Sequence, residues 1–153
     1  MSPLTVKTGN SRLSSETLHA STVALDGRAV MISGPSGSGK SDLALRLIDR
    51  GFTLVSDDQS IVRRDGERLI ASAPPTIAGK LEIRGIGIVA MDHLDDVPVA
   101  LLVELTSDIQ RLPDDSRERP VLGIPLPLVS MDAMTASAAS KVVLALDRLG
   151  LKL

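Results

Sequence analysis

The segment GPSGSGKS, residues 34–41, constrains the fold of this chain more than any other feature. It matches the pattern G-x-x-x-x-G-K-[ST], in which a glycine-rich loop turns successive backbone N–H groups toward phosphate. Such a loop needs a strand before it and a helix after it. The apolar run 29–33 fits a strand, and residues 40–50 carry apolar side chains at helical spacing before Gly51. The sequence therefore predicts an α/β fold built around a phosphate-binding loop.

The loop itself is the predicted nucleotide-binding site. Lys40 should reach the β- and γ-phosphates, and the Ser41 hydroxyl should take a coordination position on Mg²⁺. The start of the following helix adds a partial positive charge. The predicted nucleotide-binding residues are Gly34, Pro35, Ser36, Gly37, Ser38, Gly39, Lys40 and Ser41.

Two Asp-Gly pairs predict β-hairpins. Asp26-Gly27 and Asp65-Gly66 each stand between extended apolar runs, as in turns that need positive φ. The first hairpin puts an antiparallel strand beside the strand that leads into the loop, so the sheet should be mixed. Further strands are predicted at residues 53–56, 81–89 and 99–105, with a proline-containing edge strand at 121–130 and a closing helix capped by Asp132.

Length and composition exclude several classes of protein. The 153 residues fit one domain, with residues 1–14 as a flexible segment and 15–153 as the P-loop domain. A net charge of −2 gives no attraction toward nucleic acid or anionic lipid, and the absence of cysteine excludes disulfides and thiolate metal sites. Neither a membrane-spanning run nor a secretory signal is present. We expect a cytoplasmic protein that binds neither nucleic acid nor membrane.

Three carboxylates are candidates for chemistry. Asp57 and Asp58 follow the predicted strand 53–56, at the sheet edge where α/β domains bind ligands. One can hold Mg²⁺ or its water while the other accepts a proton from an attacking hydroxyl, although a solvated acidic turn is the competing interpretation. Glu82, within LEIRGIGIV, is a candidate direct or indirect Mg²⁺ ligand, and a half-buried strand with outward charges explains it equally well.

The basic residues that could belong to the site give a weaker signal than the carboxylates. His19 precedes the first hairpin and, taken alone, is more typical of a surface or core residue. Arg111, Arg117 and Arg119 lie in the charged segment 107–120, which we expect to be an exposed loop. Such arginines can clamp a transferring phosphoryl group, and for Arg111 this is as good an interpretation as a solvated loop.

Taken together, these features resemble the catalytic domain of HPr kinase/phosphorylase. The resemblance is carried by His19, the GPSGSGKS loop, the Asp57-Asp58 pair and LEIRGIGIV, and it runs from about Leu18 to Val89. The chain resembles the family's short form, which lacks an N-terminal domain, and it has MDAMTASAASK where the family has an arginine- and glycine-containing loop near the C-terminus.

The resemblance implies a phosphoenolpyruvate-carboxykinase-like mixed sheet with flanking helices, and an activity. The enzyme would use ATP and Mg²⁺ to phosphorylate a serine of the phosphocarrier protein HPr, and could reverse the transfer by phosphorolysis. By position, Ser41 and Glu82 would be the Mg²⁺ ligands and Asp58 the proton acceptor, with Asp57 organising the metal. His19 and, less securely, Arg111 match the family's histidine and its arginine in a D-R-hydrophobic-G segment.

Two other functions stay open at this point. A small-metabolite P-loop kinase would use residues 110–119 as an arginine lid over both substrates. A nucleotide-responsive binding module would keep ATP binding without useful catalysis. Association into a homo-oligomer is also left open.

Overall fold

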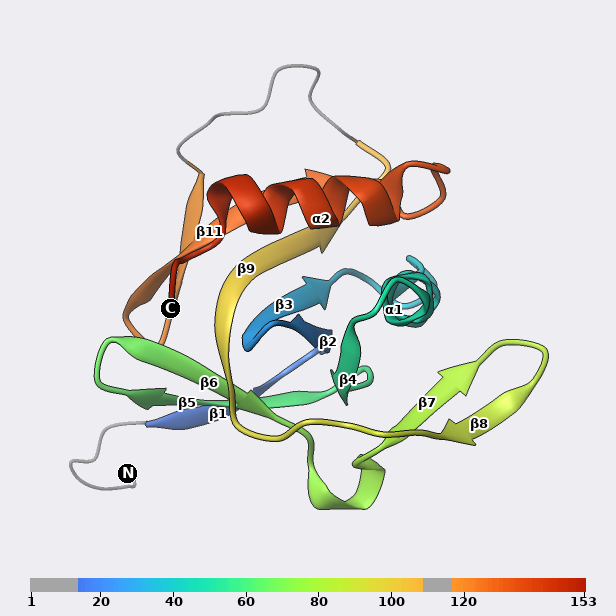
Figure 1. The fold of residues 1–153 in the computed structure, drawn as a ribbon, viewed down its shortest axis with the longest axis horizontal. Helices are drawn as coiled ribbons and strands as arrows, with labels where there is room; N and C mark the ends of the chain where they lie inside the picture. Colours follow the sequence, from blue (N-terminus) through green and yellow to red (C-terminus); the bar gives the residue numbers. More distant parts are fainter. Residues whose placement is uncertain (1–13, 109–116) are drawn as a thin grey trace.

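The computed structural model describes residues 14–108 and 117–153 of the chain. Its main feature is a curled mixed sheet with two helices, α1 (Lys40–Asp49) and α2 (Ala138–Leu149), packed on one of its faces (Figure 1). A short 3₁₀ helix, η1, spans Pro75–Ile77. The strands are β1 (Ser15–Leu18), β2 (Ala20–Leu25), β3 (Arg28–Ser33), β4 (Thr53–Ser56), β5 (Ser60–Asp65), β6 (Arg68–Ser72), β7 (Lys80–Ile83), β8 (Gly87–Ala90), β9 (Val97–Leu105), β10 (Glu118–Val121) and β11 (Ile124–Met131).

The sheet is mixed, as the sequence predicts. Its hydrogen-bonded order is β1-β5-β6-β9-β3-β2-β4, with β11 joined to β9 and β10 joined to β11. β3, β9 and β11 are parallel, whereas β2 is antiparallel to both of its neighbours, β3 and β4. Two antiparallel pairings in succession restore the strand direction, so β4 ends at the same edge of the sheet as β3. The residues after these two strands are thereby brought together.

The β2–β3 hairpin forms where the first Asp-Gly pair predicts it. Asp26 and Gly27 both have positive φ, 52° and 77°. Positive φ at both central residues is the requirement of a two-residue turn whose twist matches that of the strands. The second pair also predicts a hairpin correctly, β5–β6, but Asp65 ends β5 and pairs with Arg68, so the turn residues are Gly66, with φ of 64°, and Glu67.

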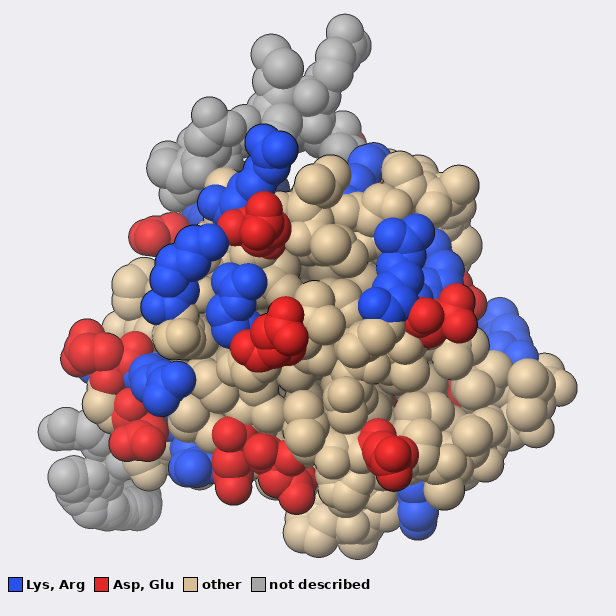
Figure 2. Space-filling view, viewed as in Figure 1, with Lys and Arg blue, Asp and Glu red and all other residues tan. Residues whose placement is uncertain are grey.

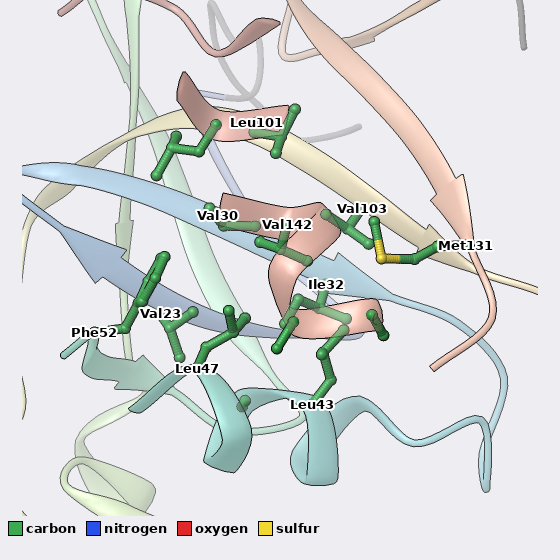
Figure 3. Packing of buried hydrophobic residues seen from close by; sticks show 14 of the residues in the cluster. Val23, Val30, Ile32, Leu43, Leu47, Phe52, Leu101, Val103, Met131 and Val142 are labelled. Carbon is green, nitrogen blue, oxygen red and sulfur yellow. The ribbon is translucent and has the colours of Figure 1, made fainter. Parts of the chain in front are cut away.

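Buried apolar residues form a core on each face of the sheet. The first core packs α1 and α2 against the sheet (Figure 3) and contains Val23, Val30, Ile32, Leu43, Leu47, Phe52, Leu101, Val103, Met131, Val142 and Leu146 among others. The second lies inside the curl, where side chains of β5 and β6 meet those of β10 and β11. Phe52, the single aromatic residue, is 4% exposed and belongs to the first core, so it does not form a stacking surface for a base.

The segment LEIRGIGIV is not the single strand expected from its sequence. It forms the antiparallel hairpin β7–β8, a separate two-stranded sheet that extends away from the main sheet in Figure 1. Gly85 and Gly87 have φ of 86° and 115°, and two such residues allow the chain to reverse within the segment. The two glycines therefore allow a complete turn inside the segment that was expected to be one strand.

The proline-containing segment 121–130 is also a hairpin rather than one edge strand. β10 begins at Glu118, inside the segment expected to be a loop, and a turn at Leu122-Gly123 leads into β11. The edge prediction holds for the first half of β11, where Pro125 and Pro127 pair only with β10. The second half of β11, from Leu128, pairs with β9. A proline there would cost a ladder hydrogen bond, because proline has no N–H.

The last helix begins later than predicted. α2 starts at Ala138, and Asp132 instead stabilises a preceding turn, where its Oδ1 accepts the Met134 N–H at 2.9 Å. Met134 is exposed and does not join the helical face. Neither α1 nor α2, the helices of the described ranges, has the length and apolar character needed to cross a membrane.

Candidate active site

The glycine-rich loop connects β3 to α1 at the carboxyl edge of the sheet. Gly37 and Gly39 have φ of 81° and 100°, which L side chains rarely adopt. A Cβ at Gly39 would lie 3.1 Å from the Cβ of Ala133, and one at Gly34 would lie 2.6 Å from Ser38 Oγ. Glycine is therefore required at these positions by backbone conformation and by close approach, as the motif predicts.

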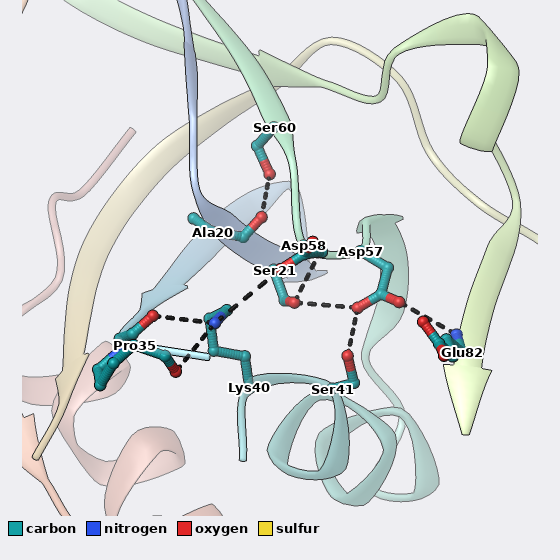
Figure 4. A network of polar contacts seen from close by, with 10 residues as sticks. Ala20, Ser21, Pro35, Lys40, Ser41, Asp57, Asp58, Ser60 and Glu82 are labelled. Atoms are coloured by element: carbon teal, nitrogen blue, oxygen red, sulfur yellow. Dashed lines mark hydrogen bonds and ion pairs between the residues drawn. The ribbon is translucent and has the colours of Figure 1, made fainter. Parts of the chain in front are cut away.

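Lys40 lies in the loop's interior in this structure. Its Nζ donates hydrogen bonds to the carbonyl oxygens of Gly34, at 2.9 Å, and Pro35, at 3.3 Å, and is 3.9 Å from Asp58 Oδ1 (Figure 4). The side chain is buried. The ammonium group is thus held inside the loop, between neutral carbonyls and one carboxylate.

Asp57 connects three elements through its buried carboxylate. Oδ1 accepts hydrogen bonds from Ser41 Oγ, at 2.6 Å, and Ser21 Oγ, at 3.0 Å. Oδ2 accepts the backbone N–H of Glu82 at 3.0 Å. The start of α1, the first half of β2 and the strand β7 are therefore held around one side chain, as Figure 4 shows.

Asp58 has the opposite environment. Its side chain is 59% exposed and has Lys40 as its ion-pair partner. Its φ is 65°, and its backbone N–H donates to Ser21 Oγ at 3.0 Å. A buried carboxylate that holds the P-loop serine and an exposed one that faces the P-loop lysine are suited to different tasks.

The remaining predicted site residues are only partly brought together. Glu82 reaches Asp57 through its backbone, while its own side chain is exposed. His19 is exposed between β1 and β2, and no hydrogen bond or ion pair joins it to another described residue. Arg111 lies outside the described residues.

Arg117 and Arg119, the other two arginines of the expected lid, are paired with Glu104. Arg119 donates to Glu104 Oε2 at 3.0 Å, and Arg117 lies 3.7 Å from Oε1 and donates to Ser130 Oγ at 2.8 Å. The hydrogen bond from Arg119 lowers the pKa of Glu104 below its ordinary value, with further contributions from Ser130 and Arg117. Figure 2 shows acidic and basic side chains interspersed over the face of the molecule that is also viewed in Figure 1.

The donor groups fit a nucleotide and Mg²⁺. Ser38 Oγ, at the centre of the loop, is buried and has no hydrogen-bond partner among the described residues, so it is available to a ligand or water. The described residues contain no group of three metal-binding side chains. A hydroxyl with one or two carboxylates is nevertheless the usual protein share of a Mg²⁺ site, because phosphates and water supply the other oxygens.

Sequence reasoning missed Ser21, which contacts both aspartates. Ser21 is fully buried and pairs with Ile32 in the β2–β3 hairpin. Ile32 lies two residues before Gly34, the first residue of the loop. Continuing the register of the hairpin outward from Asp26-Gly27 would have placed a hydroxyl there. The contact with Asp57 depends in addition on the pairing of β4 with β2, which no local pattern specifies.

The fold and site define an α/β domain of P-loop architecture, in which a strand-loop-helix unit faces two aspartates from a strand two places away. The chain belongs to the HPr Serine kinase C-terminal domain family, whose pattern it matches over residues 11–147. This confirms the family predicted from the sequence.

Known relatives agree with this assignment. The HPr kinase/phosphorylase of Prosthecochloris aestuarii is 38% identical over 126 residues, which are 74% of this chain and 37% of that protein. The HPr kinase/phosphorylase of Clostridium botulinum is 36% identical over 128 residues, 75% of this chain and 42% of that protein. The chain thus spans less than half the length of these curated relatives.

A solved structure has the same fold. The Hpr(Ser) kinase/phosphatase from Coxiella burnetii superposes with a TM-score of 0.73 at 29% identity, covering 86% of this chain and 94% of that one. The prediction of a mixed α/β fold with flanking helices is confirmed.

Proposed function

We propose that this chain is an ATP- and Mg²⁺-dependent protein-serine kinase that phosphorylates the phosphocarrier protein HPr. The observation that carries the proposal is the division between the two aspartates. Asp57 is buried and bonded to the P-loop Ser41, whereas Asp58 is exposed and lies 3.9 Å from the Nζ of Lys40. Membership in the HPr kinase family supports HPr as the acceptor.

The loop and its neighbours would hold the cofactors. The backbone N–H groups of residues 36–41, which include the start of α1, would bind the nucleotide phosphates. Ser41, Asp57 and Glu82 would hold Mg²⁺, directly or through water, and the ion would neutralise charge on the phosphates. The Lys40 ammonium, which here contacts two neutral carbonyls and one carboxylate, would gain the phosphates as a second anionic partner.

Asp58 would act as the general base. It would accept the proton of the substrate serine as the hydroxyl oxygen forms a bond to the γ-phosphorus and the bond from that phosphorus to the β,γ-bridging oxygen breaks, leaving ADP. Its exposure makes it accessible to a serine on another protein. Lys40, beside it, would stabilise charge on the phosphoryl group.

The same residues would serve the reverse direction, which we include in the proposal. Inorganic phosphate in the loop would attack the phosphoserine phosphorus, forming pyrophosphate and returning a proton from Asp58 to the serine oxygen. Microscopic reversibility requires that the base of one direction be the acid of the other.

A phosphorylation assay with an Asp58→Asn variant tests this function. The wild-type chain, ATP, Mg²⁺ and HPr should produce phosphoserine detectable by mass spectrometry, and omission of Mg²⁺ should abolish it. Asp58→Asn should lower kcat by about 10²- to 10⁴-fold, since a general base is lost, and should retain ATP binding. Asparagine is well tolerated at positive φ, so the backbone should not change.

Asp26→Asn is the matched control, because Asp26 is also an exposed aspartate with positive φ, 52°, but lies in the β2–β3 turn. It should leave kcat unchanged. Absence of phosphoserine with wild-type protein, or turnover of small alcohols without protein phosphorylation, would contradict the proposal. Equal activity of Asp58→Asn and wild type would contradict the role of Asp58.

A further inference from the structure

We propose that Ser21 is a positioning residue that holds both aspartates of the site in their working geometry. The inference rests on the proposed kinase function, which it extends to a residue outside the phosphate loop and the acidic pair. The Ser21 side chain makes no hydrogen bond to the phosphate loop; its partners are the two aspartates. Its effect on catalysis would pass through Asp57 and Asp58.

The hydroxyl of Ser21 makes two hydrogen bonds whose directions are determined by chemistry. Its Oγ donates to Asp57 Oδ1 at 3.0 Å, and it accepts the backbone N–H of Asp58 at 3.0 Å (Figure 4). A hydroxyl has a single proton, which a carboxylate can accept and an amide N–H cannot. One buried atom therefore fixes the side chain of one aspartate and the backbone of the next.

The bond to Asp58 matters because its backbone is in an uncommon conformation. At φ 65°, Asp58 is left-handed, a region that non-glycine residues adopt only when their surroundings hold them there. This conformation directs the Asp58 carboxylate toward Lys40. Without Ser21 the amide would lose its partner, and the peptide between the two aspartates would keep only the hydrogen bond that the Gln59 N–H donates to the Asp57 carbonyl at 2.7 Å.

The bond to Asp57 matters because the same oxygen also receives the P-loop serine. Ser41 Oγ donates to Oδ1 from α1, and Ser21 Oγ donates to it from β2. β2 lies between β3 and β4 in the sheet, so Ser21 is on a rigid element, and its side chain is fully buried. Outer partners of this kind orient metal-site carboxylates and typically contribute about 10- to 100-fold to affinity or activity.

The next residue on β2 provides a matched control. Thr22 is also fully buried, and its hydroxyl is 2.7 Å from Ser60 Oγ, which in turn donates to the carbonyl of Ala20. These hydroxyls make no contact with either aspartate. Thr22→Val removes a buried hydroxyl from the same strand while keeping the shape of the side chain.

The test combines kinetics with amide exchange of Asp58, measured by NMR. In Ser21→Ala, kcat for HPr should fall by about 10- to 100-fold, while KM for ATP stays within about 3-fold, since the phosphate loop is intact. The Asp58 amide should exchange at least about 10-fold faster, because it loses its protecting hydrogen bond. Thr22→Val should match wild type in all three measurements.

A second pair of variants keeps the test decisive if Ser21→Ala does not fold. Ser21→Thr retains the hydroxyl, and threonine is favoured on a strand. It should therefore keep both the wild-type kcat and the slow exchange of the Asp58 amide. Ser21→Cys is of similar size but offers only a weak donor, so it should lose both. Equal behaviour of these two, or of Ser21→Ala and Thr22→Val, would overturn the proposal.

The two proposals can fail separately. If the wild-type chain does not phosphorylate HPr, the proposed function fails, but the exchange of the Asp58 amide still tests Ser21. An exchange rate unchanged in Ser21→Ala would overturn the positioning role even in a fully active kinase.

Discussion

At the scale of single residues, Asp57 and Asp58 have the same side chain but differ in burial and in hydrogen-bonding partners. Asp57 is 8% exposed and accepts three hydrogen bonds, from two serines and a backbone amide. Asp58 is open to solvent and faces Lys40. A carboxylate saturated with donors is suited to holding groups in place, whereas one with free lone pairs is suited to accepting a proton.

The acidic pair was predictable from the residues alone, whereas its division of roles came only from the family resemblance and stays a prediction. A strand followed by Asp-Asp near a P-loop indicates carboxylates at the phosphate site. Which of the two is buried depends on the left-handed backbone at Asp58 and on contacts with Ser21 and Glu82. Those partners come from β2 and β7, which are distant in the sequence.

Glu104 allows a prediction of pH dependence at this scale. Its bonds to Arg119 and Arg117 lower its pKa in the folded protein, so its contribution to stability is complete above the unfolded-state pKa of about 4.3 and is lost as the pH falls through the folded-state value. Glu104→Gln should reduce the free energy of unfolding by up to about 1 kcal/mol at pH 7, given its partial exposure. The difference from wild type should shrink between about pH 5 and pH 3.

Urea denaturation at pH 7, 5 and 3 measures this effect. Glu118→Gln is the control, because Glu118 is an exposed glutamate on β10, which β11 separates from β9, and it makes no ion pair with a described residue. A difference between Glu104→Gln and wild type that stays constant down to pH 3 would exclude the ion-pair explanation.

At the scale of elements, α1 is bounded by two glycines with the same conformation and different surroundings. Gly39, before the helix, has φ 100°, and Gly51, after it, has φ 101°. A Cβ on Gly39 would meet Ala133 and Met134, whereas one on Gly51 would meet nothing within 4 Å. The sequence predicts both glycines, one from the phosphate-loop motif and one from the helix stop signal.

Alanine at each position separates strain from function. Gly39→Ala and Gly51→Ala should each lower stability by about 1–2 kcal/mol, because an L residue is forced into a left-handed conformation. Only Gly39→Ala should weaken ATP binding, by about 10-fold or more, because the added methyl group displaces the loop's N–H groups. Thermal unfolding and calorimetric titration with ATP measure the two effects. Comparable loss of ATP affinity in both variants would contradict this account.

Elements whose boundaries depend on non-local contacts were predicted less well. The sequence indicates α1 and the β2–β3 hairpin through glycine and Asp-Gly signals that act within a few residues. The start of α2 was placed five residues early, because Asp132 has the chemistry of a helix cap but serves a turn, and the residue before the helix is Ser137. The β7–β8 hairpin was taken for one strand because its turn residues, 84–86, lie within an apolar alternation.

At the scale of the whole molecule, β9 organises the sheet. Its first residues pair with β6, and its last residues lie between β3 and β11, so the sheet curls around this strand. The curl creates the inner core, while α1 and α2 cover the outer face. The phosphate loop follows β3, next to the most heavily paired strand of the sheet, which provides a rigid base for the site.

The closing helix α2 offers a test of how much the outer core contributes. Leu146 is 2% exposed and packs in that core, whereas Leu144, two residues earlier, is 54% exposed. Leu146→Ala should lower the free energy of unfolding by about 2–5 kcal/mol, and Leu144→Ala by less than about 0.5 kcal/mol. Because both variants change the same residue type in one helix, helix propensity cancels in the comparison. Denaturant unfolding measures both, and similar losses would contradict the packing described.

The sequence by itself determined the phosphate loop, the helix after it, the hairpin before it, the acidic pair and the family. These depend on backbone conformations and motifs that a few neighbouring residues specify. Only the tertiary structure decided the curl of the sheet, the separate β7–β8 hairpin and the place of Ser21. Ser21 and Asp57 are 36 residues apart, and their hydrogen bond exists because β2 pairs with β3 on one side and β4 on the other. Strand pairing is set by the packing of the whole core, which local patterns do not encode.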